Sequence, residues 1–206
     1  MGPFQLLAQP LWVNLFLLVP VALFFAWRRN GIQIPRRRFL FAAIFALAFG
    51  FVEAAVVVYL RAATGLLPDY TGTLSEVQRN VIETHLEPPN IAQLPPSLLT
   101  VELFRERATI VMLASVALLT AAKARERLAV FLWTFAMWDI SYYAGLWATI
   151  RWPSSLKDLD VLFLIPVPWI AQVWFPLLVS VLTLVTVGLS SRPMHLIEAG
   201  RGAQFD

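Results

Sequence analysis

The sequence predicts an all-α integral membrane protein, a bundle of about five transmembrane helices. Of the 206 residues, 59% are hydrophobic and only 14% are charged, whereas about a quarter of the residues in soluble domains are usually charged. The apolar residues are concentrated in runs of roughly 20, the length that crosses the hydrocarbon core of a bilayer as a helix. We therefore expect residues 1–206 to form a single transmembrane domain, without a separate soluble domain.

The expected membrane spans are separated by short basic or polar segments. They cover residues 11–27, 39–60, 100–122, 128–150 and 169–189. The segment 161–168 is apolar but contains Pro166 and Pro168, so it is too short and irregular to cross the bilayer. We expect it to be an interfacial or re-entrant segment just before the last span.

A long polar segment, residues 61–99, joins the second and third spans. Within it, Thr73 and Glu76 have the spacing of a capping box, in which the two side chains satisfy backbone donors of the first helical turn. The apolar residues Leu74, Val77 and Val81 then recur at helical spacing. Pro88-Pro89 ends the run. We expect a short helix here, lying on the extracytoplasmic surface of the membrane.

The basic residues predict the orientation of the bundle. They cluster in the 28–38 segment, in the 123–127 segment and in the tail after residue 190, while the rest of the chain carries more acidic than basic residues. The positive-inside rule then places the N-terminus outside and the C-terminus in the cytoplasm of a plasma or inner membrane. The pI of about 9.7 is therefore attributed to topology signals, and nucleic acid is not an expected partner.

Several cofactor classes are excluded by the residue types that the chain lacks. There is no cysteine, so an iron–sulfur cluster held by thiolates is excluded. The two histidines, His85 and His195, both lie outside the apolar runs, which excludes haem held by two histidines within the bilayer. No lysine lies inside an expected span, which argues against a Schiff base with retinal.

Ionisable and phenolic side chains are present inside three expected spans, where charged groups are costly and usually functional. These residues are Glu53 in the second span, Glu102, Arg105, Glu106 and Arg107 in the third, and Asp139, Tyr142 and Tyr143 in the fourth. At a rise of about 1.5 Å per residue, they lie in the middle or outer half of the bilayer. The inner halves contain few polar residues. This asymmetry predicts a cavity that is open to the outside and closed towards the cytoplasm.

One interpretation of this cluster is a site for a divalent metal ion. The candidate ligands are Glu53, Glu102, Glu106, Asp139 and His85, the last from the expected surface helix. Such an oxygen-rich set suits Mg²⁺, Ca²⁺, Mn²⁺ or iron, and it suits zinc if the histidine takes part. The spacing of these residues matches no standard metal motif.

The metal interpretation leads to an enzyme that acts on a lipid or another amphiphilic substrate entering from the outer leaflet. The residues expected to carry the chemistry are Glu53, Asp139, Arg105, Tyr142 and Tyr143. A bound ion would activate water or polarise an ester or phosphoryl oxygen. A carboxylate would then act as the base and a tyrosine as the proton donor.

The alternative is an ion-pair network without metal, in which Arg105 neutralises the neighbouring carboxylates and fixes the packing of the helices. The chain would then be a non-catalytic subunit of a larger membrane complex, or a protein that binds lipid or quinone. Its partners would be membrane lipid, other membrane subunits or further copies of itself. A transporter is less favoured, because a transport path also needs polar groups in the inner halves of the spans.

Overall fold

The computed structural model describes residues 6–63 and 96–191 of the chain. These residues form five α-helices, one 3-10 helix and a two-stranded antiparallel sheet. In chain order the elements are η1 (Leu11–Leu17), α1 (Leu18–Trp27), α2 (Arg36–Ala63), α4 (Pro96–Thr120), α5 (Ala124–Ile150), β1 (Leu159–Phe163), β2 (Trp169–Gln172) and α6 (Trp174–Ser190). The predicted helical character of the chain is confirmed for this part of it.

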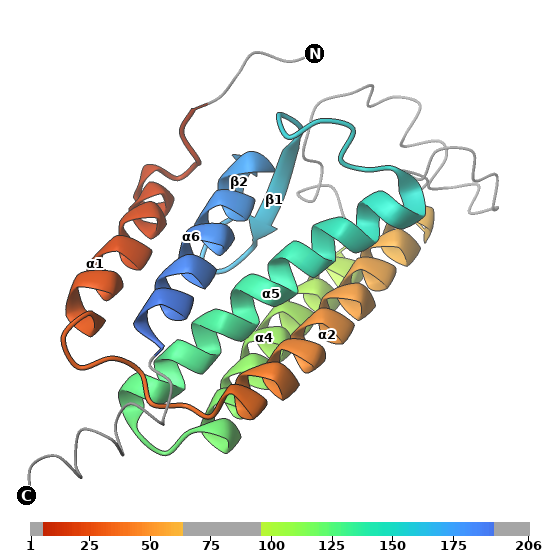
Figure 1. Ribbon diagram of the computed structural model, residues 1–206. Helices are drawn as coiled ribbons and strands as arrows, with labels where there is room; N and C mark the ends of the chain where they lie inside the picture. Colours follow the sequence, from red (N-terminus) through yellow and green to blue (C-terminus); the bar gives the residue numbers. More distant parts are fainter. Residues whose placement is uncertain (1–5, 64–95, 192–206) are drawn as a thin grey trace, which may run out of the picture.

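Helix α5 is the centre of the arrangement. It packs most extensively against α2, and it also contacts α4 and α6. Figure 1 shows α2 and α4 on one side of α5, and α6 followed by α1 on the other. Helices α4 and α6 make little direct contact. They therefore flank one face of α5, and this face carries most of the polar residues predicted in the fourth span.

Small residues allow α2 and α5 to approach closely. A side chain on Gly50 would overlap the main chain of α5 at Trp138 and the Cβ atom of Ser141. A Cβ atom on Gly145 would come within 2.9 Å of the Cβ atom of Ala54. Small residues at a helix–helix interface let the two backbones approach closely. These two glycines therefore allow the backbones of α2 and α5 to pack directly against each other.

One end of the bundle, formed by residues 28–38 and 121–127 with the C-terminal turn of α6, is called the basic end here. The backbone N–H of Ile32 donates to the carbonyl of Ser190 at 2.8 Å. The guanidinium of Arg38 donates to the carbonyl of Thr120 at 2.9 Å. An apolar cluster lies just inside, formed by Trp27, Ile32, Ile34, Ala42, Ala117, Ala121, Ala129, Val130 and Val187. Main-chain contacts and apolar packing thus close this end.

The opposite end, called the hairpin end, carries the two-stranded sheet between α5 and α6 (Figure 1). Strand β1 pairs antiparallel with β2, with Leu159 opposite Gln172. Gln9 extends this pairing, because its N–H donates to the carbonyl of Ile170 at 2.8 Å and its carbonyl accepts from the N–H of Ile170 at 2.7 Å. The chain before η1 is thereby attached to the hairpin.

The hairpin changes two predictions made from the sequence. Residues 161–168, expected to be an irregular interfacial or re-entrant segment, form most of β1 and the turn that follows it. The last helix was expected to begin at residue 169, but residues 169–172 form β2 and the helix begins at Trp174. Prolines and β-branched residues disfavour a helix in this stretch. Pairing as two strands instead satisfies the backbone N–H and C=O groups that a helix would have bonded.

The expected polar segment 61–99 lies mostly outside the described residues, and the expected surface helix lies wholly outside them. Helix α2 extends past the predicted end of the second span to Ala63, and α4 begins at Pro96, before the predicted start of the third. Within the described residues, one helix, α2, is long and apolar enough by itself to cross a membrane. The segments Leu11–Trp27 and Trp174–Ser190 are apolar helices of shorter length.

The distribution of polarity between the surface and the interior is unusual. Large apolar side chains are exposed on the outside of the helices, with Leu119 at 88%, Leu189 at 70% and Phe104 at 66% exposure. Glu53 and Glu106, in contrast, are buried between helices at 4% and 7% exposure. Acidic side chains are almost never fully buried unless they are paired, so these two carboxylates are expected to have partners inside the bundle.

Candidate functional site

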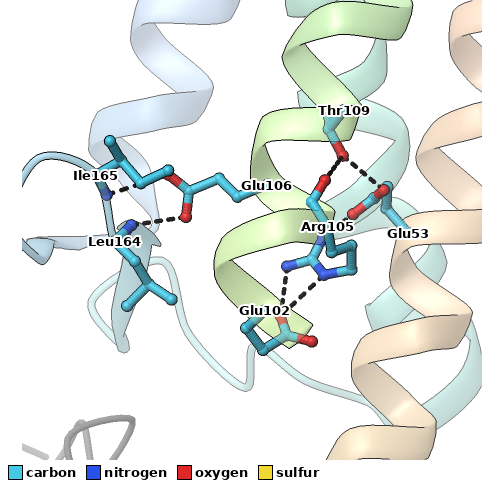
Figure 2. Close-up of polar contacts among 7 residues, drawn as sticks. All are labelled: Glu53, Glu102, Arg105, Glu106, Thr109, Leu164 and Ile165. Carbon is cyan, nitrogen blue, oxygen red and sulfur yellow. Dashed lines mark hydrogen bonds and ion pairs between the residues drawn. The ribbon is translucent and has the colours of Figure 1, made fainter. Parts of the chain in front are cut away.

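A buried ion-pair network joins α2 to α4. Arg105 of α4 forms an ion pair with Glu53 of α2, and its Nε donates to Glu102 at 2.8 Å (Figure 2). The hydroxyl of Thr109 donates to the second carboxylate oxygen of Glu53 at 2.8 Å. Charge-assisted hydrogen bonds of this kind are about twice as strong as neutral ones. The network satisfies Glu53 on both oxygens and so holds α4 against α2.

Glu106 points to the other side of α4, towards the hairpin (Figure 2). Its carboxylate accepts the backbone N–H of Leu164 at 2.8 Å and that of Ile165 at 3.1 Å. These two N–H groups lie in the turn between β1 and β2. Glu106 therefore satisfies main-chain donors that the hairpin cannot pair internally, and it attaches the hairpin to α4.

Asp139 of α5 is buried at 8% exposure and faces α6. Its Oδ2 atom accepts a hydrogen bond from the hydroxyl of Ser180 at 2.8 Å. Within residues 6–63 and 96–191, its other oxygen, Oδ1, has no hydrogen-bond partner and no basic side chain forms an ion pair with it. Asp139 is therefore less fully satisfied than Glu53 or Glu106.

Two tyrosines follow Asp139 on the next turn of α5. The hydroxyl of Tyr143 donates to Asp160 of β1 at 2.8 Å. The ring of Tyr142 stacks on that of Trp138, with centroids 6.1 Å apart, and its hydroxyl makes no hydrogen bond within the described part of the chain. Burial raises the pKa of Asp160 to about 6, although the Tyr143 hydroxyl and the charge of Arg61 partly oppose this shift.

These side chains line one cavity of about 680 Å³, between α5, α4, α6, α1 and the hairpin. Most of its lining residues are apolar or aromatic, including Phe16, Ile110, Phe135, Phe163 and Val179. The polar lining residues are Glu53, Arg105, Glu106, Arg107, Asp139, Tyr142, Tyr143, Asp160, Ser180 and Thr183. A volume of this size, mostly apolar with a few polar groups, is typical of a site for a small molecule.

We compared the chain with known proteins. No protein-family profile, curated protein or solved structure matches it. The interpretation of the cavity therefore depends on its own geometry.

The structure brings together all but one of the residues predicted to carry chemistry or bind metal. Glu53, Asp139, Arg105, Tyr142 and Tyr143 all line the cavity, and Glu106 lines it as well. Glu102 lies behind Arg105, in a smaller adjoining pocket of about 60 Å³. The remaining residue, His85, lies outside the described residues.

The acidic residues of the cavity do not converge on one point. Among residues 6–63 and 96–191, no three histidine or acidic side chains lie close enough to share a metal ion. Glu53 is bound to Arg105 and Thr109, Glu106 to the hairpin and Asp139 to Ser180. Because His85 is not described, the complete five-residue metal set stays a prediction.

Sequence reasoning missed two residues of the site. Asp160 was not among the predicted site residues, yet it lies in β1 and pairs with Tyr143. Its position directly before the apolar segment 161–165 was the available signal. Ser180 was overlooked because a serine in an apolar helix usually bonds to its own backbone. In the structure it bonds to Asp139 instead.

Proposed function

We propose that the chain is an integral membrane protein in which five helical segments cross the bilayer. The apolar exterior supports this proposal, since exposed leucine and phenylalanine side chains suit contact with lipid. Of the charged residues that make α4 less apolar, Glu102 and Glu106 are buried and paired, whereas Arg107 is exposed. Leu11–Trp27 is short in residues, but its 3-10 and α portions together reach roughly 29 Å, close to the thickness of the hydrocarbon core.

We place the basic end in the cytoplasm and the hairpin end outside, in a plasma or inner membrane. The clusters Arg28-Arg29, Arg36-Arg37-Arg38 and Lys123 to Arg127 all lie at the basic end. Positive charge of this kind is retained on the cytoplasmic side of membranes. In this orientation the cavity lies in the outer half of the bilayer, with the N-terminus outside and the C-terminus in the cytoplasm.

The function that this geometry supports best is the binding of an amphiphilic molecule taken from the outer leaflet. The observation that carries the proposal is the cavity of about 680 Å³, which combines an apolar body with buried polar groups. A molecule with an apolar chain and a polar head matches both parts. Helices α4 and α6 make little direct contact and both line the cavity, so we take the space between them as the entry for a chain lying in the bilayer.

The ion-pair network has a positioning role in this proposal. Arg105, Glu53 and Glu102 satisfy one another, and a satisfied buried network fixes how helices pack. Asp139 and Tyr142 each keep a polar atom that has no partner among residues 6–63 and 96–191, so we assign the ligand contacts to them. Metal-dependent catalysis and assembly with further subunits stay predictions from the sequence.

The proposal is tested by filling the cavity. Ile110 lies in the cavity wall on α4, whereas Leu119 of the same helix faces outward at 88% exposure. The full chain and the variants Ile110→Trp and Leu119→Trp are purified in non-ionic detergent, and retained lipids are counted by native mass spectrometry. We expect one amphiphile per chain in the wild type and in Leu119→Trp, and at least a tenfold loss of occupancy in Ile110→Trp. Equal retention by both variants would contradict the proposal.

A further inference from the structure

Several polar atoms of the cavity lack a partner in the described part of the chain. The indole Nε1 atoms of Trp138 and Trp169 are two of them. Two more lie on α5 and can accept a hydrogen bond. One is Oδ1 of Asp139, and the other is the hydroxyl of Tyr142, three residues along α5. Residues at this spacing lie on the same face of a helix. The Asp139 side chain is buried and Tyr142 is half-buried, so these two acceptors open to the cavity rather than to the outside. Buried polar groups are nearly always hydrogen-bonded, and a ligand in the cavity can complete the bonding of Asp139.

The charges that line the cavity favour a cation over an anion. Glu53 and Arg105 form an ion pair, and the other charged lining residues are Glu106, Asp139 and Asp160 against Arg107. Arg105 is already neutralised by Glu53 and Glu102. An anionic head beside Asp139 would therefore meet a carboxylate of the same charge, which is costly away from water.

Aromatic rings lie beside Asp139 on α5. Tyr142 stacks on Trp138 with ring centroids 6.1 Å apart, and it contacts Tyr143 edge to face with ring centroids 5.0 Å apart. All three residues line the cavity. Aromatic faces attract cations through their quadrupole, by about 0.5–2 kcal/mol depending on how far the cation is desolvated. Rings together with a carboxylate form a suitable environment for a positively charged nitrogen.

We propose that the ligand is an amphiphile whose polar head is a positively charged amine, bound by Oδ1 of Asp139 and the hydroxyl of Tyr142. This inference rests on the proposed function, because it specifies the head of the molecule that occupies the cavity. An ammonium N–H donates to the Asp139 carboxylate and to the phenolic oxygen of Tyr142. The alkyl chain lies along the apolar wall formed by residues such as Phe135 and Val179.

The test compares amphiphiles that differ only in the head. Dodecylamine, which is protonated at neutral pH, is titrated against dodecanol and dodecanoate, with the full chain in non-ionic maltoside micelles. The midpoint of thermal unfolding reports binding, because a ligand of the folded state raises it in a saturable way. We expect dodecylamine to bind the wild type at least tenfold more tightly than either of the other two, since hydrogen bonds to charged groups are the stronger class.

Two variants test whether Asp139 and Tyr142 produce the preference for the amine. Asp139→Asn removes the charge, and we expect it to reduce the preference for the amine at least tenfold. Tyr142→Phe removes a hydroxyl that has no hydrogen bond within the described residues, so it keeps the fold and is expected to lower amine affinity about threefold. Asp158→Asn is the matched control, because Asp158 caps the 154–155 turn and does not line the cavity.

The outcomes separate this inference from the proposed function. Tighter binding of dodecanoate, or an amine preference that persists in both Asp139→Asn and Tyr142→Phe, would overturn the inference while leaving an amphiphile site. If none of the three molecules gives a saturable shift, and Ile110→Trp retains lipid as the wild type does, the proposed function fails too. A preference that is lost in Asp139→Asn and kept in Asp158→Asn supports the inference.

Discussion

The two ends of this bundle are built from the same helices but are closed in different ways. At the basic end, small and branched residues of α5, such as Ala129 and Val130, are fully buried against their neighbours. At the hairpin end the same helix carries Asp139, Tyr142 and Tyr143, which line a cavity. The polarity and size of a few residues on one helix thus determine whether the neighbouring helices close around it or leave a space.

The difference also appears in the type of bond that joins the elements. The basic end depends on main-chain groups, such as the bond from the N–H of Ile32 to the carbonyl of Ser190. The hairpin end depends on side-chain carboxylates, in particular Glu53 and Glu106. Substitutions at the hairpin end should therefore have larger effects than equivalent substitutions at the basic end, because an unpaired buried charge is costly.

The largest effect is expected from Arg105→Met. This change leaves Glu53 and Glu102 buried without their shared cation, which typically costs about 3–5 kcal/mol. Arg38→Met is the matched variant at the basic end. It removes one exposed bond to the carbonyl of Thr120, worth about 1 kcal/mol. The free energy of unfolding is measured by denaturant titration in detergent micelles. Equal losses in the two variants would mean that the two ends do not differ as described.

A smaller effect is expected from Gly50→Ala. The added methyl group would collide with the main chain of α5 at Trp138, and overpacking of this kind costs about 1–3 kcal/mol. Gly188 of α6 is the control, because a methyl group there meets no atom within 4 Å. Gly188→Ala should be neutral or stabilising by up to about 1 kcal/mol, since alanine favours the helix. Stability is measured by thermal unfolding. If both variants lose stability equally, the loss in Gly50→Ala is not caused by the close approach of α2 and α5.

The smallest effect is expected from Glu106→Gln, and it should be local. The amide accepts hydrogen bonds more weakly than the carboxylate, which costs about 1 kcal/mol at the hairpin turn. Hydrogen exchange at the amides of Leu164 and Ile165 should then become roughly five- to tenfold faster.

Glu126→Gln is the matched control for Glu106→Gln, because Glu126 is a buried carboxylate at the basic end. It should leave exchange at the hairpin unchanged. Exchange that is unaffected by Glu106→Gln would show that Glu106 does not hold the hairpin.

Much of the helical architecture could be predicted from the sequence, because long apolar runs bounded by arginine clusters specify helix positions directly. The predicted 39–60 and 128–150 spans correspond to α2 and α5. The hairpin could not be predicted in this way. Its strands are short, and their pairing depends on partners such as Gln9 and Glu106 that are distant along the chain.

It was easier to predict which residues belong to the site than which of them bond to each other. An ionisable residue in an apolar run is conspicuous, so Glu53, Arg105 and Asp139 were identified from the sequence and all of them line the cavity. Which carboxylate pairs with which donor depends on helix rotation and on the hairpin, and spacing along one helix does not specify either. That is why Arg105 could be predicted as a partner of carboxylates, whereas the bond from Ser180 to Asp139 could not.

The adjacent positions of Arg105 and Glu106 on α4 have a mechanical consequence. One residue binds α2 and the next binds the hairpin, so a single turn of helix holds the wall of the cavity and the hairpin turn together. Because Gly50 and Gly145 keep α2 and α5 in close contact, that pair acts as a fixed frame. Any rotation of α4 against this frame would displace the hairpin in the same movement, so the entry and the interior of the cavity would change together.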